Sequence, residues 1–465
     1  MRFRSIIAVA AAAVLTLTLA GCGSDDDGGG DAGGSLTIWS LEDNAERIKA
    51  TQAIVDKYSK DKGVQVKLVA VNEDQFPTLI QNAAASGDVP DAIGALSLGN
   101  QIRLNTDQIS DPDAANEVVE ALGKDTFTPR SLELVSKDGK PVSVPSDGWT
   151  QLLVYRKDLF EKAGLKPPTT YDAMQAAAQK LNTGGTAGIV VATKPGDTFT
   201  QQTFEHFALA NNCQLTDDAG KVVLNSPACV NSTRFFTDLV KNYGVKGGQD
   251  VDTTRAAYFA GKAAMVVWSS FILDELAGLR NDALPNCPEC KGDPTFLSKN
   301  SGIVTSFQGP DGTQPSGYGE ISGWAITNDA KNKEGAKQFV QYMMNDAYPD
   351  WLALAPEGKF PVRLGDASDP EKFTKAWDGL KAGVDKKEPL SEVYPPETLD
   401  IIRNSASTLN RWGFPQGQGA LVGAMLGELP VPKAIASVLD GQATPEKAME
   451  TAQSEVQEIA DSAQG

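Results

Sequence analysis

Two hydrophobic periods alternate along the first part of the chain. Apolar residues take every second position in residues 35–40 and 64–68, which predicts strands. Residues 48–58 and 76–83 carry apolar side chains three or four positions apart, which predicts helices, and residues 91–95 predict a third strand. Strands joined by helices of this length indicate a parallel sheet with crossover helices.

A second series of this kind follows and indicates a second α/β lobe. A capping box formed by Thr169 and Asp172 is expected to open one of its helices. The other predicted strands and helices of this series are residues 151–155, 188–192, 235–243 and 263–268. A strand through residues 324–326 and a further helix come next, and the chain from about Asp366 is predicted to be mostly helical.

The N-terminus has the pattern of an export signal. Arg2 and Arg4 precede an apolar run that ends at Ala20, shorter than the ~20 residues of a membrane-spanning helix. The following Gly21-Cys22 completes a tetrapeptide that resembles the bacterial lipobox. We therefore expect residues 1–21 to be a lipoprotein signal peptide. Cys22 would carry the lipid anchor and, with the Gly- and Asp-rich residues up to 34, form a flexible linker.

Length, charge and cysteine content narrow the class further. The 465 residues exceed what one core supports, so two lobes are expected. A formal net charge of -18 disfavours nucleic acid and anionic lipid as partners. Of the five cysteines, four remain when Cys22 is set aside as the anchor. An even number outside the cytoplasm favours disulfides, and we predict the local pairing. The pairs would join Cys213 to Cys229 and Cys287 to Cys290.

Few catalytic or metal-binding patterns are present. The single histidine, His206, lies in an apolar periodic segment, which disfavours a Ser-His-Asp triad and a zinc site and indicates a structural role. The Gly-rich stretches have the wrong spacing for a dinucleotide or phosphate loop, so no cofactor is predicted. A glycosidase needs only two carboxylates and therefore stays open as an alternative.

Aromatic and polar residues gather at predicted strand ends and loops. Indole rings stack on the C–H faces of sugars, while carboxylates and guanidinium groups pair with hydroxyls, so these positions are typical of a carbohydrate site. The candidate ligand-binding residues are Glu42, Asp147, Trp149, Trp268, Ser269, Gly323, Trp324 and Arg411.

Several longer stretches resemble the family 1, maltose-binding-protein-like extracellular solute-binding proteins of bacterial ABC importers. They are LVYRKDLFEKAGL from Leu153, YFAGKAAMVVW from Tyr258, GWAITNDAKNKEGAKQFVQYMM from Gly323, GKFPVR from Gly358, and LDG at 439–441 followed by TPE at 444–446. The resemblance implies a two-lobed periplasmic-binding-protein-like fold with a ligand cleft between the lobes. It also implies ligand contacts at Glu42, Asp147, Trp268, Gly323 and Trp324, and a further ligand contact at Arg411.

The resemblance implies crossings between the lobes near Gly148, Tyr318 and Gly365. One lobe would hold residues 35–147 and 318–365, and the other residues 148–317 and 366–465. The expected protein is a monomeric, lipid-anchored receptor outside the cytoplasm. It would be no enzyme, would close on a small carbohydrate and would deliver it to permease subunits. A polyol or a polyamine remains an alternative ligand.

Overall fold

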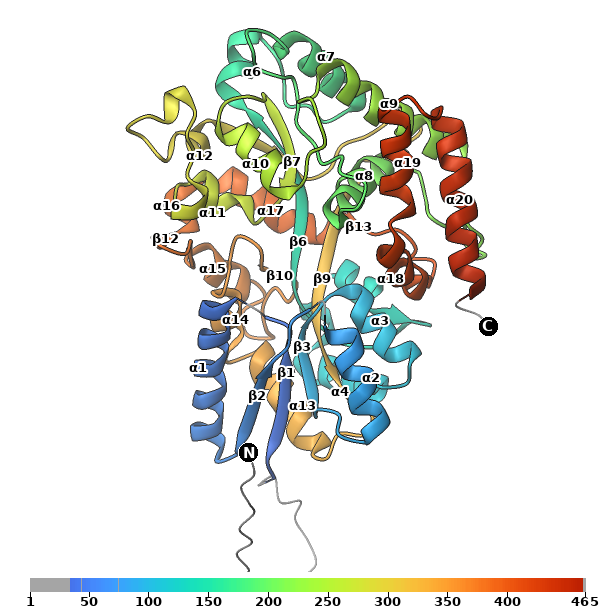
Figure 1. Ribbon diagram of the computed structural model, residues 1–465. Helices are drawn as coiled ribbons and strands as arrows, with labels where there is room; N and C mark the ends of the chain where they lie inside the picture. Colours follow the sequence, from blue (N-terminus) through green and yellow to red (C-terminus); the bar gives the residue numbers. More distant parts are fainter. Residues whose placement is uncertain (1–33, 43, 74, 463–465) are drawn as a thin grey trace, which may run out of the picture. The chain divides into compact units, whose positions relative to one another are not determined.

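The computed structural model describes residues 34–42, 44–73 and 75–462 (Figure 1). The predicted signal peptide, Cys22 and most of the linker lie outside these residues. The predicted β-α-β-α-β order is confirmed. Its strands are β1 (Leu36–Ser40), β2 (Val66–Ala70) and β3 (Ala92–Leu96), and its connecting helices are α1 (Ala45–Lys62) and α2 (Phe76–Ser86). Strand β1 pairs in parallel with both β2 and β3.

Local sequence sets the limits of α1. The Asn44 side chain caps its N-terminus by accepting hydrogen bonds from the backbone N–H groups of Glu46 and Arg47. The helix ends at Gly63, whose left-handed backbone (φ 70°) suits a residue without a Cβ. These contacts place the loop after β1 at the start of α1. Strands β1–β3 and helices α1 and α2 form one group of elements. The same group contains α3 (Leu98–Thr106), α4 (Pro112–Leu122), α5 (Pro129–Leu134), α13 (Lys333–Met344) and α14 (Tyr348–Leu352).

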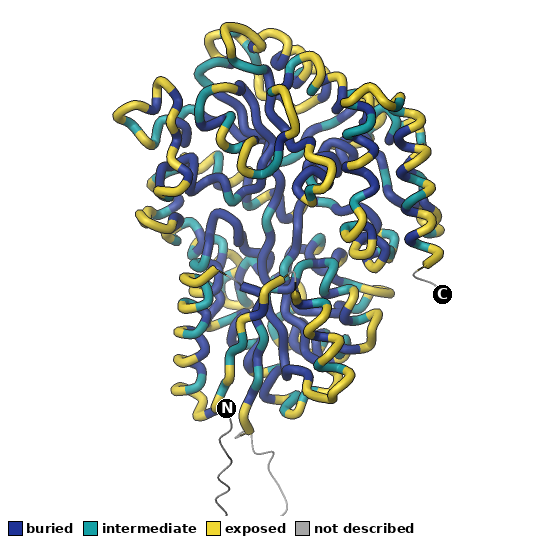
Figure 2. Tube along the Cα trace, viewed as in Figure 1, coloured by how far each residue is buried: buried dark blue, intermediate teal, exposed yellow. Residues whose placement is uncertain are grey.

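Two long strands connect this group to the rest of the chain. The first half of β6 (Val144–Arg156) pairs with β9 (Gly317–Ile326), which also pairs with β3. The second half of β6 pairs with β7 (Met265–Ser269) and β8 (Ser301–Val304). Buried residues follow both long strands in Figure 2. The sequence pattern revealed only residues 151–155 of β6, because Pro145 and Gly148 interrupt its earlier half.

The C-terminal part of the chain is mostly helical, as predicted. The helices not yet named lie within residues 157–462. They are α6 (Lys157–Ala163), α7 (Tyr171–Leu181), α8 (Thr198–Ala210), α9 (Pro227–Tyr243), α10 (Val251–Phe259), α11 (Ile272–Leu276), α12 (Phe296–Asn300), α15 (Lys372–Asp378), α16 (Leu390–Val393), α17 (Pro396–Thr408), α18 (Gly419–Glu428), α19 (Pro430–Leu439) and α20 (Pro445–Ser462). The remaining short strands are β4 (Ser136–Lys137), β5 (Lys140–Pro141), β10 (Phe360–Pro361), β11 (Lys381–Ala382), β12 (Glu388–Pro389) and β13 (Leu409–Asn410).

Two local predictions were wrong. Residues 188–192 form isolated bridges, through Ile189 and Val190, instead of a strand. Helix α7 has no capping box from Thr169, because its N-cap is Thr170, whose hydroxyl accepts the N–H of Ala173. Neither error changes the architecture.

No single helix in the described part of the chain meets the length and hydropathy required to span a membrane. Helices α18 and α19 pass that test only when taken together, and they are bent by 51° where they meet.

The predicted local disulfide pairing is confirmed. Cys213 joins Cys229 across a separation of 16 residues, and Cys287 joins Cys290 across three. A disulfide stabilises mainly by restricting the unfolded chain, so the longer loop should contribute more.

We expect replacement of Cys213 and Cys229 by alanine to lower the free energy of unfolding by about 3 kcal/mol on the loop-entropy scale. The matched replacement of Cys287 and Cys290 removes a disulfide that closes a much shorter loop, so it should cost about 2 kcal/mol. Urea unfolding followed by far-UV circular dichroism measures both values. A larger loss for the Cys287 and Cys290 variant would contradict the loop-entropy explanation.

Candidate functional site

A cavity of about 440 Å³ lies beside the two long strands. Its walls come from the carboxyl end of β3, from β6 and β9, from α8, and from α18 with the loop before it. Ligand sites of α/β sheets occur at the carboxyl ends of strands, which is where this cavity meets β3. Its lining residues are Glu73, Ala95, Ser97, Gly99, Trp149, Thr198, Gln201, Gln202, Glu205, Tyr318, Glu320, Ser322, Arg411, Val422 and Leu426. We call this cavity the cleft.

An aromatic pair forms the strand side of the cleft. The rings of Trp149 on β6 and Tyr318 on β9 lie 5.6 Å apart between centroids, and Trp149 also contacts Phe271 at 6.4 Å. His206 supports this wall, because its Nδ1 accepts the backbone N–H of Tyr318 at 2.9 Å. Burial lowers the pKa of His206 to about 3. The histidine is therefore neutral and structural, as the sequence indicated.

A charged network closes another side of the cleft. The guanidinium of Arg411 donates to Glu205 at 3.3 Å and to Glu320, and it stacks over the Tyr318 ring at 4.6 Å. Glu205 also accepts the N–H of Trp412, while Glu320 accepts the N–H of Leu98. Burial raises the pKa of Glu205, although Arg411 opposes the shift. One cation thus faces two carboxylates.

Gln201 adds an unpaired amide to the cleft. This residue of α8 is 1% exposed, and neither its Oε1 nor its Nε2 has a hydrogen-bond partner within the described residues. A buried amide without partners costs free energy, so the site favours a molecule that both donates and accepts. Hydroxyl groups do both.

Trp149 and Arg411 are the two sequence-predicted residues that line the cleft. The structure places the other six elsewhere. Glu42 and Asp147 are buried in an ion cluster with Lys359, whose Nζ lies 2.6 Å from Glu42 Oε1 and 2.9 Å from Asp147 Oδ1. Burial would raise the pKa of Glu42, but Lys359 and Arg47 outweigh it and hold the pKa below its usual value.

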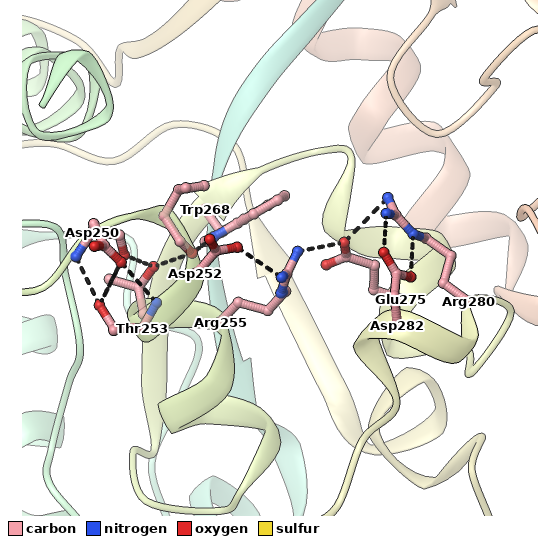
Figure 3. A network of polar contacts seen from close by, with 10 residues as sticks. Asp250, Asp252, Thr253, Arg255, Trp268, Glu275, Arg280 and Asp282 are labelled. Carbon is pink, nitrogen blue, oxygen red and sulfur yellow. Dashed lines mark hydrogen bonds and ion pairs between the residues drawn. The ribbon is translucent and has the colours of Figure 1, made fainter. Parts of the chain in front are cut away.

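Trp268 and Ser269 belong to the buried strand β7. The Trp268 indole donates to the backbone oxygen of Val251 at 2.9 Å, and Arg255 lies over its ring at 5.7 Å (Figure 3). Arg255 is in turn held by Glu275 at 2.8 Å. These contacts fix Trp268 within a structural network, and Trp268 is not among the residues that line the cleft.

Gly323 and Trp324 lie in the core of β9. Trp324 is 1% exposed and packs on Trp351, with 5.2 Å between ring centroids. A Cβ on Gly94 would come within 2.3 Å of this indole, and one on Gly323 within 2.6 Å of Gln101. The two glycines therefore make room for large neighbours, and Trp324 fills space inside the protein.

Sequence reasoning missed several lining residues. Glu205 and Gln201 lie in a helix whose apolar spacing predicted only packing, and Glu320 lies inside a strand. The family resemblance indicated Tyr318 only as a crossing point between the two lobes. No local motif marks these positions, because the fold alone brings α8 and β9 together.

Comparisons with known proteins agree with this architecture. A family model described as bacterial extracellular solute-binding protein matches residues 43–348. The putative ABC transporter periplasmic-binding protein YcjN of Escherichia coli K12 is 28% identical over 324 residues, covering 68% of this chain and 70% of that protein. The sn-glycerol-3-phosphate-binding protein UgpB of Brucella abortus is 29% identical over 245 residues, covering 48% of this chain and 55% of UgpB.

Solved structures share the fold at low identity. The GacH receptor of Streptomyces glaucescens, solved unliganded and with acarbose, has a TM-score of 0.68 at 18% identity, covering 92% of this chain and 98% of that one. Maltose-bound MalE3 of T. maritima gives 0.67 at 17%, covering 92% and 100%. A ribitol-bound solute-binding protein of Agrobacterium radiobacter K84 gives 0.63 at 22%, covering 92% and 99%.

Proposed function

The chain belongs to the bacterial extracellular solute-binding proteins, and from this premise we propose that it captures a small neutral carbohydrate for an ABC importer. The observation that carries the carbohydrate assignment is the pairing, in one cleft, of the Trp149 ring with the unpartnered amide of Gln201. A sugar stacks its C–H face on an aromatic ring and offers hydroxyls as donors and acceptors. GacH and MalE3 were solved with ligands of this class.

The charge of the cleft supports a neutral ligand. Arg411 is the cation of the charged network, and its guanidinium already donates hydrogen bonds to Glu205 and Glu320. A phosphate would have to displace one of these carboxylates and would then lie beside a buried negative charge, which is costly. We therefore propose a sugar or a polyol for this chain in preference to a phosphorylated solute such as the one that UgpB is named for.

Closure of two lobes around the ligand is the proposed mechanism. Strand β6 pairs with β9 through its first half and with β7 through its second, which supports a crossing near Gly148. The other proposed crossings remain near Tyr318 and Gly365, with the lobe limits given above. A ligand that contacts both lobes binds the closed form better and shifts the equilibrium toward it. Permease subunits would then recognise the closed form.

The proposed location is the outer face of the cell membrane. Disulfides form in oxidising compartments, and the two disulfides agree with an exported protein. Lipid attachment at Cys22, after removal of residues 1–21, would keep the monomeric receptor near its permease.

A thermal-shift screen tests the function. The purified protein would be heated with mono-, di- and oligosaccharides, polyols, amino acids and polyamines. A ligand at 100 times its dissociation constant adds about 2.7 kcal/mol of stability, which raises the unfolding midpoint measurably. Hits confined to amino acids or polyamines would overturn the carbohydrate assignment. Hydrolysis of a bound oligosaccharide would instead reveal a glycosidase.

With a sugar identified, we expect Trp149→Ala to weaken its binding ten- to a hundredfold, about 1.4 to 2.8 kcal/mol, because the stacking surface is lost. Isothermal titration calorimetry measures the dissociation constant. Trp39→Ala is the matched control, since Trp39 is also half-buried but lies outside the cleft. Equal losses for the two variants would argue against stacking on Trp149.

A further inference from the structure

A second cavity, of about 600 Å³, shares no lining residue with the cleft. It lies between the start of α1, the segment around α11, the loop after α14 and residues 383–387. Phe271 contacts the walls of both cavities, because its ring lies 6.4 Å from that of Trp149 in the cleft and 5.3 Å from the Arg47 guanidinium in the second cavity. We call this second cavity the carboxylate cavity, after Asp274 and Glu357 in its wall.

Asp274 and Glu357 are buried and incompletely paired. Asp274 is 2% exposed and Glu357 is 5% exposed. Oδ1 of Asp274 and Oε2 of Glu357 have no hydrogen-bond partner within the described residues. Buried carboxylate oxygens require donors, and two neighbouring carboxylates also require positive charge.

The cations of the cavity wall already serve other carboxylates. Arg280 donates to Asp282 at 2.7 Å and lies 3.4 Å from Glu275 (Figure 3). Arg47 pairs with Glu42 at 3.6 Å. Lys387 is exposed at the rim, and its charge lowers the pKa of Glu357 by Coulomb attraction alone. Asp385 and Glu46 add further negative charge to the wall, and Asp385 accepts the N–H of Asn281.

We propose that the carboxylate cavity binds an organic ammonium group, with Asp274 and Glu357 as its hydrogen-bond acceptors. A protonated amine supplies both the donors and the positive charge that the two carboxylates lack. A hydroxyl would supply donors without the charge, and an anion would be repelled. A metal ion does not suit the site, because the described residues contain no group of three or more His, Cys, Asp or Glu side chains able to hold one.

Ammonium binding at this site is linked to protons. Burial and the neighbouring Glu357 raise the pKa of Asp274 to about 8, and burial raises the pKa of Glu357. The pair therefore retains a proton at neutral pH when no ligand is bound, although Arg280 and Arg47 favour the charged forms. The ammonium group takes the place of that proton. For an amine that stays protonated over this range, such as putrescine, binding should release up to about one proton, and affinity should rise from pH 6 to pH 8.

Two sources could supply the amine, a free polyamine or an amino sugar. Calorimetric titrations of the purified protein with putrescine and with D-glucosamine, in roughly 150 mM salt to screen the acidic surface, distinguish them. D-glucose, which has the ring without the amine, is the control. We expect at least one amine to bind with proton release, seen as an enthalpy that differs between phosphate and HEPES buffers, neither of which carries a primary ammonium group. If neither amine binds, the proposal is overturned. It is also overturned if putrescine does not bind and glucosamine binds no tighter than glucose.

Matched variants locate the binding. Asp274→Asn combined with Glu357→Gln keeps the shape of both side chains and should weaken the amine at least tenfold while abolishing proton release. Asp385→Asn removes one charge from the exposed rim of the same cavity and should change affinity less than threefold. Glu357→Gln alone should weaken binding in the same direction and serves if the double variant folds poorly. Unchanged affinity in the carboxylate variants, or an equal loss in Asp385→Asn, would contradict the assignment.

Discussion

Replacement of Lys359 by methionine is expected to lower the free energy of unfolding by about 3 to 5 kcal/mol, because it leaves the buried Asp147 without a cation and the buried Glu42 with Arg47 alone. Lys359 is 4% exposed, and its ammonium lies 2.6 Å from Glu42, 2.9 Å from Asp147 and 4.5 Å from the centroid of the Trp351 ring. Methionine fills similar space but carries no charge. Urea unfolding at pH 7 measures the loss.

Lys372→Met is the control for this prediction, since Lys372 forms an exposed pair with Asp366. Its expected cost is about 0 to 1 kcal/mol. A similar small cost for Lys359→Met would show that the buried cluster contributes little.

The pH dependence of Lys359→Met should differ from that of the parent protein. In the parent, the lowered pKa of Glu42 stabilises the fold above the pKa of the unfolded carboxyl, and this contribution is lost as pH falls through the folded value. Without Lys359, Arg47 alone opposes the effect of burial on Glu42, so the pKa of this carboxyl rises and protonation at lower pH stabilises the variant relative to the parent. We expect the difference in stability between parent and variant to shrink from pH 7 to pH 5. A constant difference would contradict the charge explanation.

Trp324→Ala is expected to cost about 3 to 5 kcal/mol of stability, the usual range for removing a large buried aromatic side chain. The indole packs on Trp351 and Phe339, at 5.2 and 5.8 Å between centroids, and against the backbone of Gly94. Thermal unfolding of the ligand-free protein should show a clearly lower midpoint. Sugar affinity, measured well below that midpoint, should change less than threefold because Trp324 is not part of the cleft lining.

Trp324→Phe separates packing from hydrogen bonding. The indole Nε1 has no partner within the described residues, so phenylalanine loses only volume and should cost less than alanine. Loss of sugar affinity with an unchanged midpoint would return Trp324 to the ligand contacts that the sequence resemblance implied.

Patterns along the chain predicted the sheet better than the site. The period of two in β1 and β2 and the helical spacing of α1 and α2 are local properties, and their order implied parallel pairing. The cysteine pairing was predicted for the same reason, since both pairs are close in sequence. Strand β6 was only half recognised, because Pro145 and Gly148 interrupt the pattern of its first half, which the distant strand β9 holds in the sheet.

The candidate site shows the limit of reading residue types at strand ends. Trp149 and Trp324 both looked like sugar-stacking residues, yet one lines the cleft and the other fills the core. They lie on neighbouring strands, and side-chain direction on a strand reverses at every residue. Register, which β6 and β9 set between themselves with a bulge near Pro145, decides which ring faces the cleft.

The sequence alone determined the α/β class, the family resemblance, the exclusion of common catalytic motifs and the local disulfides, because each depends on residues near one another in the chain. Tertiary structure decided which charges meet. Arg411 reaches Glu205 and Glu320 across 206 and 91 residues, Lys359 reaches Glu42 and Asp147, and Asp274 and Glu357 meet at one cavity. Burial then sets the free energy of each charged group, because a carboxylate that water solvates on the surface is destabilising in the interior unless a cation or hydrogen-bond donor compensates it.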